Sequence, residues 1–429
     1  MDSGDTSWIL ASSALVLLMT PGLAFFYGGL VRGKNVITTM LQVVAVILVV
    51  SLQWVIIGYS LAFGPDFHHI IGNFQWFLMN GVGAQPDSNY AGTIPNMVFG
   101  IFQMMFAIIT PALIVGGLAE RVKFASFIVF IVLWATLIYD PLAHWVWGAG
   151  GWLHQLGVLD FAGGTVVHIS SGVAGLVAAI YLGRRAEHGS GSIKAHNVPF
   201  VLLGTALLWF GWFGFNAGSA LGANFLSAEA FLATNTATAA AAVGWMIVEK
   251  LKTGHVSLVG VCAGAVAGLV AITPAAGFVS PGGSIILGLL GGAICYFAST
   301  FMKSKLGYDD ALDAFGGHGI GGTWGAIATG LFATTAVNSS GANGLFEGNP
   351  HQLLLQLIGV VATWLFSGIG TWILLKVVDL VMGIRVTKEE EIMGLDLILH
   401  HESAYPETLT PTQIQKFFPE QSATFPKNE

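Results

Sequence analysis

Eleven apolar segments, each long enough to cross a lipid bilayer, constrain this chain more than any other feature of its sequence. About 20 residues of helix cross a hydrocarbon core that is roughly 30 Å thick. In lipid every backbone N–H and C=O must find a partner inside the protein, so such segments fold as helices. The sequence therefore predicts an all-α polytopic membrane protein with eleven transmembrane helices, at 8–31, 36–63, 96–118, 125–147, 162–182, 198–217, 229–248, 256–277, 284–302, 310–335 and 353–382.

The composition excludes an ordinary water-soluble domain. Hydrophobic residues make up 54% of the chain and charged residues only 9%, so there is too little polar side chain to cover a soluble surface. We expect the lipid bilayer as the surrounding medium, and no nucleic acid as a partner. The 57 glycines suit helices that pack closely in a membrane, where small residues let backbones approach.

The positive charges give an independent test of the count and an orientation. With eleven helices, all sixteen Lys and Arg residues fall on one side of the membrane, and the opposite loops, near 64–95, 148–161, 218–228, 278–283 and 336–352, contain none. Cytoplasmic loops carry the excess of Lys and Arg. We therefore expect a multi-pass protein of the cell (plasma) membrane with its N-terminus outside and its C-terminus in the cytoplasm.

An odd number of helices fits two five-helix halves of opposite orientation plus one further helix, a plan common among transporters. The halves would cover about 8–182 and 198–335, and the extra helix 353–382. The transmembrane domain is then 1–382. Residues 383–429 form a cytoplasmic tail that is too short for a catalytic domain, and we expect no enzyme.

Two histidines carry the strongest functional signal. His168 lies eight residues after Asp160, and His318 lies eight residues after Asp310, about 12 Å along a helix. Because the two spans run in opposite directions, both imidazoles should meet near the middle of the membrane. Intramembrane ionisable groups are usually functional, and a histidine can pass a proton near neutral pH. The alternative is a hydrogen-bonded pair that only braces two helices.

The other polar and aromatic residues suggest less. Asp160 and Asp310 sit near helix starts, where a carboxylate caps backbone N–H groups. Apart from the histidines, the apolar spans offer no carboxylate pair or lysine to neutralise an ion in mid-bilayer, so the substrate is neutral or sheds its charge on the way. Some aromatic rings could bind a cation by their faces, but composition does not select them. The cysteines Cys262 and Cys295 are expected as core residues, and no metal site or cofactor is predicted.

Several motifs resemble those of the Amt/Mep/Rh family of ammonium transporters, and of its Amt branch in particular. The resemblance covers about residue 5 to Tyr405. Its motifs are PGLAFFYGG (21–29), AERVKF (119–124), DFAGGTVVH (160–168), GWFGFNAGS (211–219), AITPA (271–275), FGGHG (315–319) and, in the tail, GIRVTKEEE (383–391).

The resemblance implies a set of site residues. Trp147, Phe106 and Ser219 match an external ammonium site, and Phe106 with Phe215 matches the ring pair that closes the pore below it. His168 and His318 match the twin histidines of the conduction path, and Asp160 matches a structural residue behind the external site. The resemblance also implies a homotrimer with one pore per subunit and a cytoplasmic signal protein of the PII type as a possible partner.

Three alternatives to electrogenic ammonium transport stay open on the sequence. The pore could pass neutral NH3 without protons. The chain could instead be an ammonium sensor that signals through its tail. Paired intramembrane histidines also ligate haem iron, although no second histidine pair or redox motif accompanies them.

Overall fold

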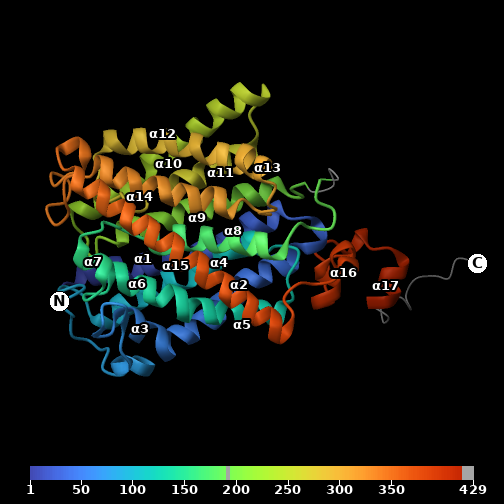
Figure 1. Ribbon diagram of the computed structural model, residues 1–429, viewed down its shortest axis with the longest axis horizontal. Helices are drawn as coiled ribbons and strands as arrows, with labels where there is room; N and C mark the ends of the chain where they lie inside the picture. The colour runs from blue at the N-terminus through green and yellow to red at the C-terminus, as the bar shows by residue number, and fades with distance from the viewer. Residues whose placement is uncertain (190–193, 418–429) are drawn as a thin grey trace, which may run out of the picture.

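The computed structural model describes residues 1–189 and 194–417, which are largely helical. Within these residues nine helical segments are long and apolar enough to span a membrane. Four of them are single helices: α1 (Ser3–Leu30), α4 (Asn96–Leu118), α9 (Val198–Gly218) and α10 (Phe225–Thr253). A fifth, α15 (Pro350–Met382), crosses one side of the bundle (Figure 1).

The other four long segments contain π-helical turns. The first consists of α2 (Val36–Gln53), η2 (Trp54–Gly58) and α3 (Tyr59–Phe63), and the second of α5 (Phe124–Trp134), η4 (Ala135–Tyr139), α6 (Asp140–Trp147) and α7 (Trp152–Leu156). The third consists of η5 (Gly164–Ile169) and α8 (Ser170–Leu182). The fourth consists of α12 (Pro281–Phe297), η6 (Ala298–Met302) and α13 (Lys303–Leu306).

Two further helical segments correspond to the eighth and tenth predicted spans. Helix α11 (Leu258–Ile272) is apolar but shorter than the others, and η7 (Phe315–Ile320) continues into α14 (Gly321–Phe332). The count of eleven crossings therefore remains a prediction. The elements outside the spans are small: 3-10 turns at Gly33–Asn35, Phe74–Met79, Leu345–Glu347 and Pro406–Thr408, with α16 (Lys388–Met393), η9 (Asp396–His400) and α17 (Pro411–Phe417) in the tail.

One detail departs from an all-helical fold. The loop after α3 contains a short antiparallel hairpin, β1 (Asp66–Phe67) and β2 (Ile71–Gly72). The apolar pattern that marks membrane spans carries no signal for such a short polar turn.

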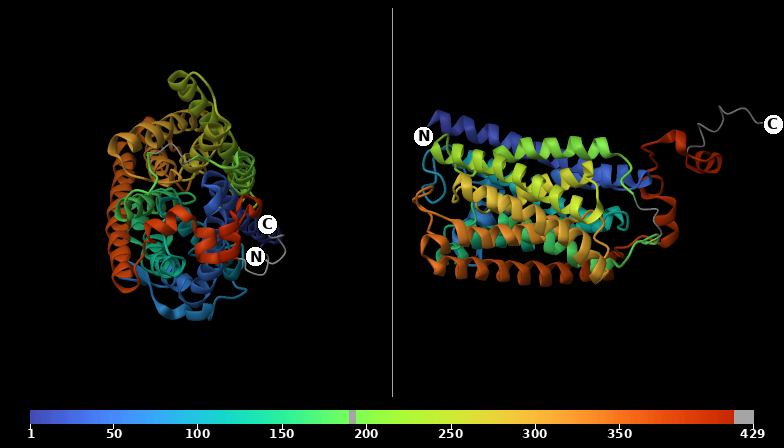
Figure 2. Two further views of the ribbon diagram at one scale, coloured as in Figure 1. Left: turned by 90° about the vertical axis from the view of Figure 1, so that its right-hand side faces the viewer. Right: turned by 90° about the horizontal axis from the view of Figure 1, so that it is seen from above.

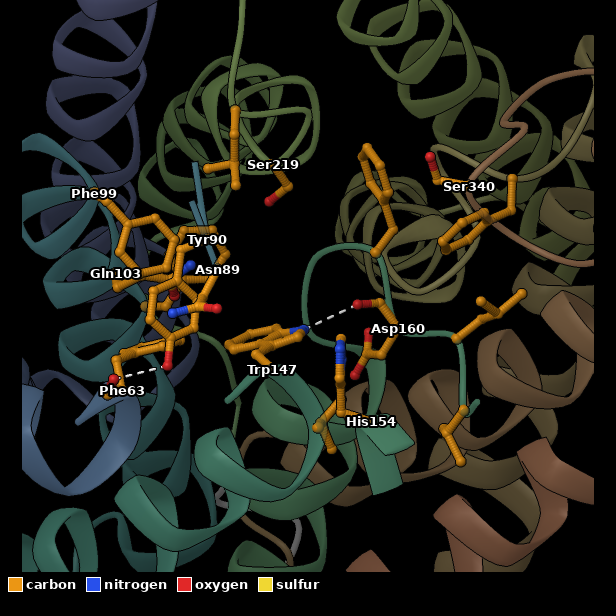
Figure 3. Close-up of a pocket in the computed structure, with 17 residues that line it drawn as sticks. Phe63, Asn89, Tyr90, Phe99, Gln103, Trp147, His154, Asp160, Ser219 and Ser340 are labelled. Atoms are coloured by element: carbon orange, nitrogen blue, oxygen red, sulfur yellow. Dashed lines mark hydrogen bonds between the residues drawn. The ribbon is translucent and has the colours of Figure 1, made fainter. Parts of the chain in front are cut away.

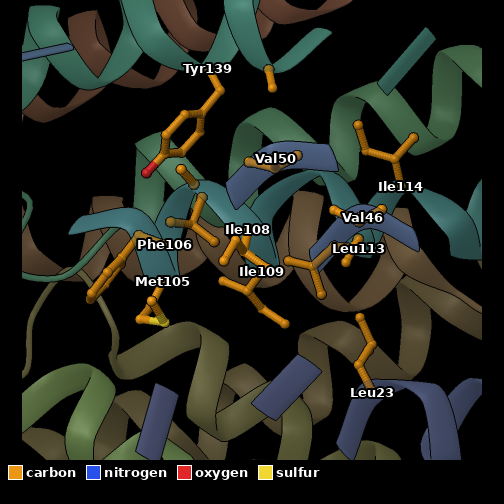
Figure 4. Packing of buried hydrophobic residues seen from close by; sticks show 14 of the residues in the cluster. Leu23, Val46, Val50, Met105, Phe106, Ile108, Ile109, Leu113, Ile114 and Tyr139 are labelled. Atoms are coloured by element: carbon orange, nitrogen blue, oxygen red, sulfur yellow. The ribbon is translucent and has the colours of Figure 1, made fainter. Parts of the chain in front are cut away.

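The long helices run side by side, roughly along the longest axis of the molecule, and the N-terminus and the tail helix α17 lie at opposite ends (Figures 1 and 2). Helix α4 occupies the centre. Its side chains Phe106, Ile109 and Leu113 pack in one buried cluster with Leu23 of α1 and Val46 of α2 (Figure 4). Because α4 is enclosed by other helices, the residues it carries face the interior of the bundle rather than lipid.

The basic loops meet at one end of the bundle, as the charge pattern requires. Arg32 follows α1, Glu120 follows α4, and Arg185 follows α8; Asp309 precedes η7. Arg32 Nη2 lies 2.7 Å from Glu120 Oε2, and Arg185 lies 3.2 Å from Glu120 and 2.8 Å from Asp309. All four are buried. We call Arg32, Glu120, Arg185 and Asp309 the charge cluster.

The charges of the cluster set the protonation of its acids. Burial alone would raise the pKa of Glu120, but hydrogen bonds and charges from Arg32 and Arg185 outweigh it and lower that pKa. Burial likewise opposes ionisation of Asp309, and Arg185 and Arg121 hold its pKa well below the usual range. Both carboxylates are therefore ionised at neutral pH, each beside a guanidinium.

The tail packs against the same end. Asp396 accepts hydrogen bonds from the backbone N–H of Ile37 (3.0 Å) and Thr38 (2.8 Å) at the start of α2. The Leu395 N–H donates to the Asn35 side chain at 2.9 Å. Tyr405 shares a 2.9 Å hydrogen bond with His196. The segment from Ile384 to Tyr405 is thus fixed to the loops between the spans.

Candidate functional site

The aspartates Asp160 and Asp310 each cap the π-helical turn that carries a histidine. Asp160 accepts from the backbone N–H of Gly163 (2.8 Å), Gly164 (2.6 Å), Thr165 (2.8 Å) and Val166 (3.3 Å), and also from the Thr165 hydroxyl. Such N–H groups have no partner inside their own helix. The capping role predicted for Asp160 is confirmed.

The second half repeats this local design. Asp310 accepts from the N–H of Ala314 (3.2 Å) and Phe315 (2.8 Å). Three residues after each aspartate the backbone turns left-handed, at Gly163 (φ +119°) and at Asp313 (φ +57°). Asp160 lines a cavity at the N-terminal end of the bundle, whereas Asp310 follows Asp309 of the charge cluster at the opposite end. The two histidine segments thus enter the bundle from opposite ends.

Glycines let these two segments touch. A Cβ on Gly172, one turn after His168, would lie 2.1 Å from the backbone N of Gly319, directly after His318. A Cβ on Gly322 would lie 3.0 Å from the His168 Cβ. Any larger residue at Gly172 would push the helices apart. The close crossing brings the imidazoles within reach of one another.

The predicted meeting of the histidines is confirmed. Nδ1 of His168 lies 3.3 Å from Nδ1 of His318, and the two rings are nearly parallel, with centroids 5.3 Å apart. Both side chains are buried. A haem ligated by both imidazoles would lie between them as its two axial ligands, so a pair whose nitrogens are in direct contact does not fit a haem iron between the rings. The described residues hold no group of three or more metal-ligating side chains.

Hydrogen bonds around Thr273 assign the protons on both rings. The Thr273 hydroxyl donates to the Leu269 carbonyl (2.8 Å), so its oxygen accepts from Trp212 Nε1–H (2.9 Å) and from His168 Nε2 (3.3 Å). His168 therefore carries its proton on Nε2, and its Nδ1 accepts from His318 Nδ1–H. The Nε2 of neutral His318 is left with a free lone pair.

A cavity of about 300 Å³ opens at the N-terminal end of the bundle and collects the predicted external-site residues. Phe106, Trp147, Ser219 and Asp160 all line it, and Figure 3 labels the last three. The Trp147 indole N–H donates to the Asp160 carbonyl at 2.9 Å. The Ser219 hydroxyl donates to the Phe215 carbonyl at 2.9 Å, so its oxygen lone pairs remain available to a donor in the cavity.

An aromatic constriction separates this cavity from the histidines. The rings of Phe106 and Phe215 lie 4.3 Å apart, centroid to centroid, and both are buried. Phe106 also meets Trp147 edge to face at 6.0 Å. Below them lies a narrow pocket of about 10 Å³, lined by both histidines and by apolar side chains, among them Leu23, Leu208 and Trp212. This volume is close to the smallest space that holds one water molecule.

The structure thus brings together all seven residues that the resemblance implied: three at the cavity, two at the constriction with Phe106 shared, two imidazoles below, and Asp160 behind. Sequence reasoning gave no role to Thr273, which anchors His168, or to Gln103, which also lines the cavity. A threonine directly before Pro274 in an apolar run was the available signal for the first.

Removal of the Asp160 carboxylate should be severe. In Asp160→Ala the four N–H groups before His168 lose their acceptor, and loss of one ordinary cap already costs about 0.5–2 kcal/mol. Asp160→Asn keeps one acceptor oxygen and should lie between alanine and wild type. Thermal unfolding in detergent measures the effect, and an Asp160→Ala variant as stable as wild type would contradict the capping role.

A bundle of apolar helices around an aromatic cavity, a narrow apolar passage and a buried polar pair defines a polytopic membrane transport protein. The family model described as the Ammonium Transporter Family matches residues 7–405. The chain belongs to this family.

Relatives and solved structures agree. An ammonium transporter of Bacillus subtilis (strain 168) is 54% identical over 409 residues, which is 95% of this chain and 100% of the relative. The crystal structure of Candida albicans Mep2 is similar with a TM-score of 0.87 and 38% identity, covering 95% of this chain and 92% of that one. A structure described as a sensor Amt protein has a TM-score of 0.86 and 32% identity, covering 92% and 98%.

Proposed function

We propose that this chain carries ammonium across a membrane as an electrogenic transporter: NH4+ binds at the outer cavity, loses a proton, and crosses as NH3 while the histidines relay H+. The observation that carries the proposal is the contact between His168 and His318 directly below an aromatic cavity and constriction. Membership of the family supports the choice of substrate.

The outer cavity suits a small cation. The faces of Phe106 and Trp147 attract positive charge, each by about 0.5–2 kcal/mol, and Ser219 offers an oxygen acceptor. Asp160 directs its carboxylate at backbone N–H groups, so we assign it support of the site rather than direct contact with the ion. None of these four residues carries a positive charge that would attract an anion.

The apolar passage makes proton loss necessary. Moving a bare monovalent cation into a medium of low dielectric costs on the order of tens of kcal/mol, whereas NH3 is neutral and small. The tilted Phe106 and Phe215 rings, whose centroids are 4.3 Å apart, must part to let it through. The proton would travel separately along the histidines.

The assigned protons give the relay a definite state. An inward step starts from the other tautomers, with protons on His168 Nδ1 and His318 Nε2. A proton joins Nε2 of His168, the proton on its Nδ1 moves to Nδ1 of His318, and the proton on Nε2 of His318 leaves. The pair then ends with protons on His168 Nε2 and His318 Nδ1, the arrangement that the Thr273 network indicates. Both imidazoles must exchange tautomers before the next inward step.

The experiment that tests transport is a current measurement on proteoliposomes adsorbed to a solid-supported membrane. An ammonium jump should produce a saturable current in wild type, and an equal jump of K+ should produce none. Ammonium uptake without current would favour the neutral NH3 channel instead. Absence of both uptake and current would reject transport, and growth rescue of cells that lack ammonium uptake gives an independent readout.

Orientation and assembly complete the proposal. We propose eleven crossings with the N-terminus outside, the charge cluster and tail in the cytoplasm of the cell membrane, and a homotrimer with one pore in each subunit. A PII-type signal protein would bind the cytoplasmic face.

A sensor role is the second candidate, supported by the similarity to the sensor Amt protein and by the tail segment that Asp396 fixes to α2. Transport by the isolated chain with no downstream signal would separate the two.

A further inference from the structure

Gln103 is a polar side chain at the outer cavity to which the functions above assign no role. It lies on α4, three residues before Phe106, and it lines the same cavity as Trp147 and Ser219. Only 9% of its surface is exposed. Figure 3 shows it across the cavity from Asp160.

The amide of Gln103 has no hydrogen-bond partner in the part of the chain that the structure describes. Its Oε1 is buried without a hydrogen bond, and within the described residues the side chain makes no other hydrogen bond. An unpaired buried amide costs free energy, so a residue of this type at a cavity wall is best explained by a ligand that pairs with it. Because neither end of the amide is held, its carbonyl oxygen is free to turn into the cavity.

The number of N–H donors on ammonium fits the unpaired carbonyl oxygen of Gln103. NH4+ has four N–H donors in a tetrahedron. Ser219 supplies one oxygen acceptor, and Phe106 and Trp147 supply two ring faces. One donor is then unmatched unless Gln103 accepts it. Methylammonium has only three N–H donors, so it can place its methyl group where the fourth acceptor stands.

We infer that Gln103 is a fourth ligand of the outer site and that it selects NH4+ over methylated amines. This inference rests on the proposed transport function. Removing the acceptor should weaken ammonium binding more than methylammonium binding, because only ammonium uses all four contacts.

The test compares Gln103→Met with a matched control, Gln42→Met. Gln42 on α2 is also buried and its Oε1 also lacks a partner, but it does not line the outer cavity. Saturation of the ammonium and methylammonium currents is measured for each variant. In Gln103→Met the half-saturating ammonium concentration should rise about tenfold, the effect of losing one hydrogen bond to a charged group, whereas the value for methylammonium should rise about threefold or less; Gln42→Met should match wild type.

A second variant gives a change of opposite sign. Gln103→Glu places a carboxylate at the wall, and it should lower the half-saturating ammonium concentration, since charge-assisted hydrogen bonds are stronger. Equal changes for both amines, equal effects of Gln103→Met and Gln42→Met, or weaker ammonium binding in Gln103→Glu would each overturn the inference. If wild type itself carries no ammonium current, the proposed function fails rather than the role of Gln103.

Discussion

Replacing His168 and His318 together by alanine should reduce the ammonium current at least about 100-fold, the contribution typical of a positioned proton-transfer group. The pocket that both rings line is otherwise apolar, so nothing else in it can hold a proton between the constriction and the far end. Without the relay the charge has no path, although neutral NH3 can still pass. The measurement is current in solid-supported membranes beside NH3 flux, read with a pH-sensitive dye in the same vesicles.

The control is a variant that also loses a histidine, but one that lies outside the passage. His255 lies exposed in the turn between α10 and α11, and His255→Ala should conduct like wild type. Each single replacement at His168 or His318 should lose most of the current, because one imidazole alone cannot span the passage. A double variant with undiminished current would reject the relay and leave the pair with a bracing role.

Replacing Arg185 by methionine should destabilise the protein by about 3 kcal/mol, the lower end of the cost of breaking a buried ion pair, because Glu120 keeps Arg32 and Asp309 keeps Arg121. Arg185 pairs with both Glu120 and Asp309, and all three are buried. Removing it leaves Asp309 with Arg121 at 3.8 Å as its remaining arginine. Thermal unfolding in detergent measures the loss.

The neighbouring Arg184 provides the matched control, since it is exposed and, among residues 1–189 and 194–417, its side chain donates only to the Gly307 carbonyl. Arg184→Met should shift the unfolding midpoint little. If Arg185→Met and Arg184→Met unfold at the same temperature, the charge cluster contributes nothing measurable to stability.

The pH dependence of the cluster follows from the same charges. The pKa values of Glu120 and Asp309 are lowered in the folded protein. Their contribution is therefore fully present above the unfolded carboxyl pKa of about 4 and is lost as pH falls through the lower folded values. Wild type should show no loss from these groups between pH 5 and 8 (a window set by ~4 as the unfolded value), and in Arg185→Met the acid-induced decline should begin at higher pH.

Apolar length and positive charge were enough to place the helices closely. The predicted span 96–118 coincides with α4, and 198–217 differs from α9 by one residue. These features follow from the thickness of the lipid bilayer alone, since each crossing needs about 20 apolar residues. The site was harder to predict from the residues alone. The equal Asp-to-His spacings predicted the meeting of the imidazoles, whereas the external site came from family resemblance.

The features that escaped prediction depend on tertiary contacts. The threonine before Pro274 is a local signal, but it does not show that Thr273 accepts from His168, and nothing local marks Gln103 as a cavity residue. Each role needs two helices placed side by side. The π-helical turns were also missed. An apolar helix with one additional residue per turn looks the same in hydropathy, and only packing against a neighbour selects it.

Both imidazoles project from such widened turns, η5 and η7. A π turn is an α turn that has gained a residue. Loss of one residue from either would restore α geometry and move the histidine by one position, roughly 100° about the axis, relative to the helix that follows, which would swing the imidazole out of the passage. The chain therefore tolerates changes of residue type between aspartate and histidine better than changes of length, and genetic variation there should be limited to substitutions.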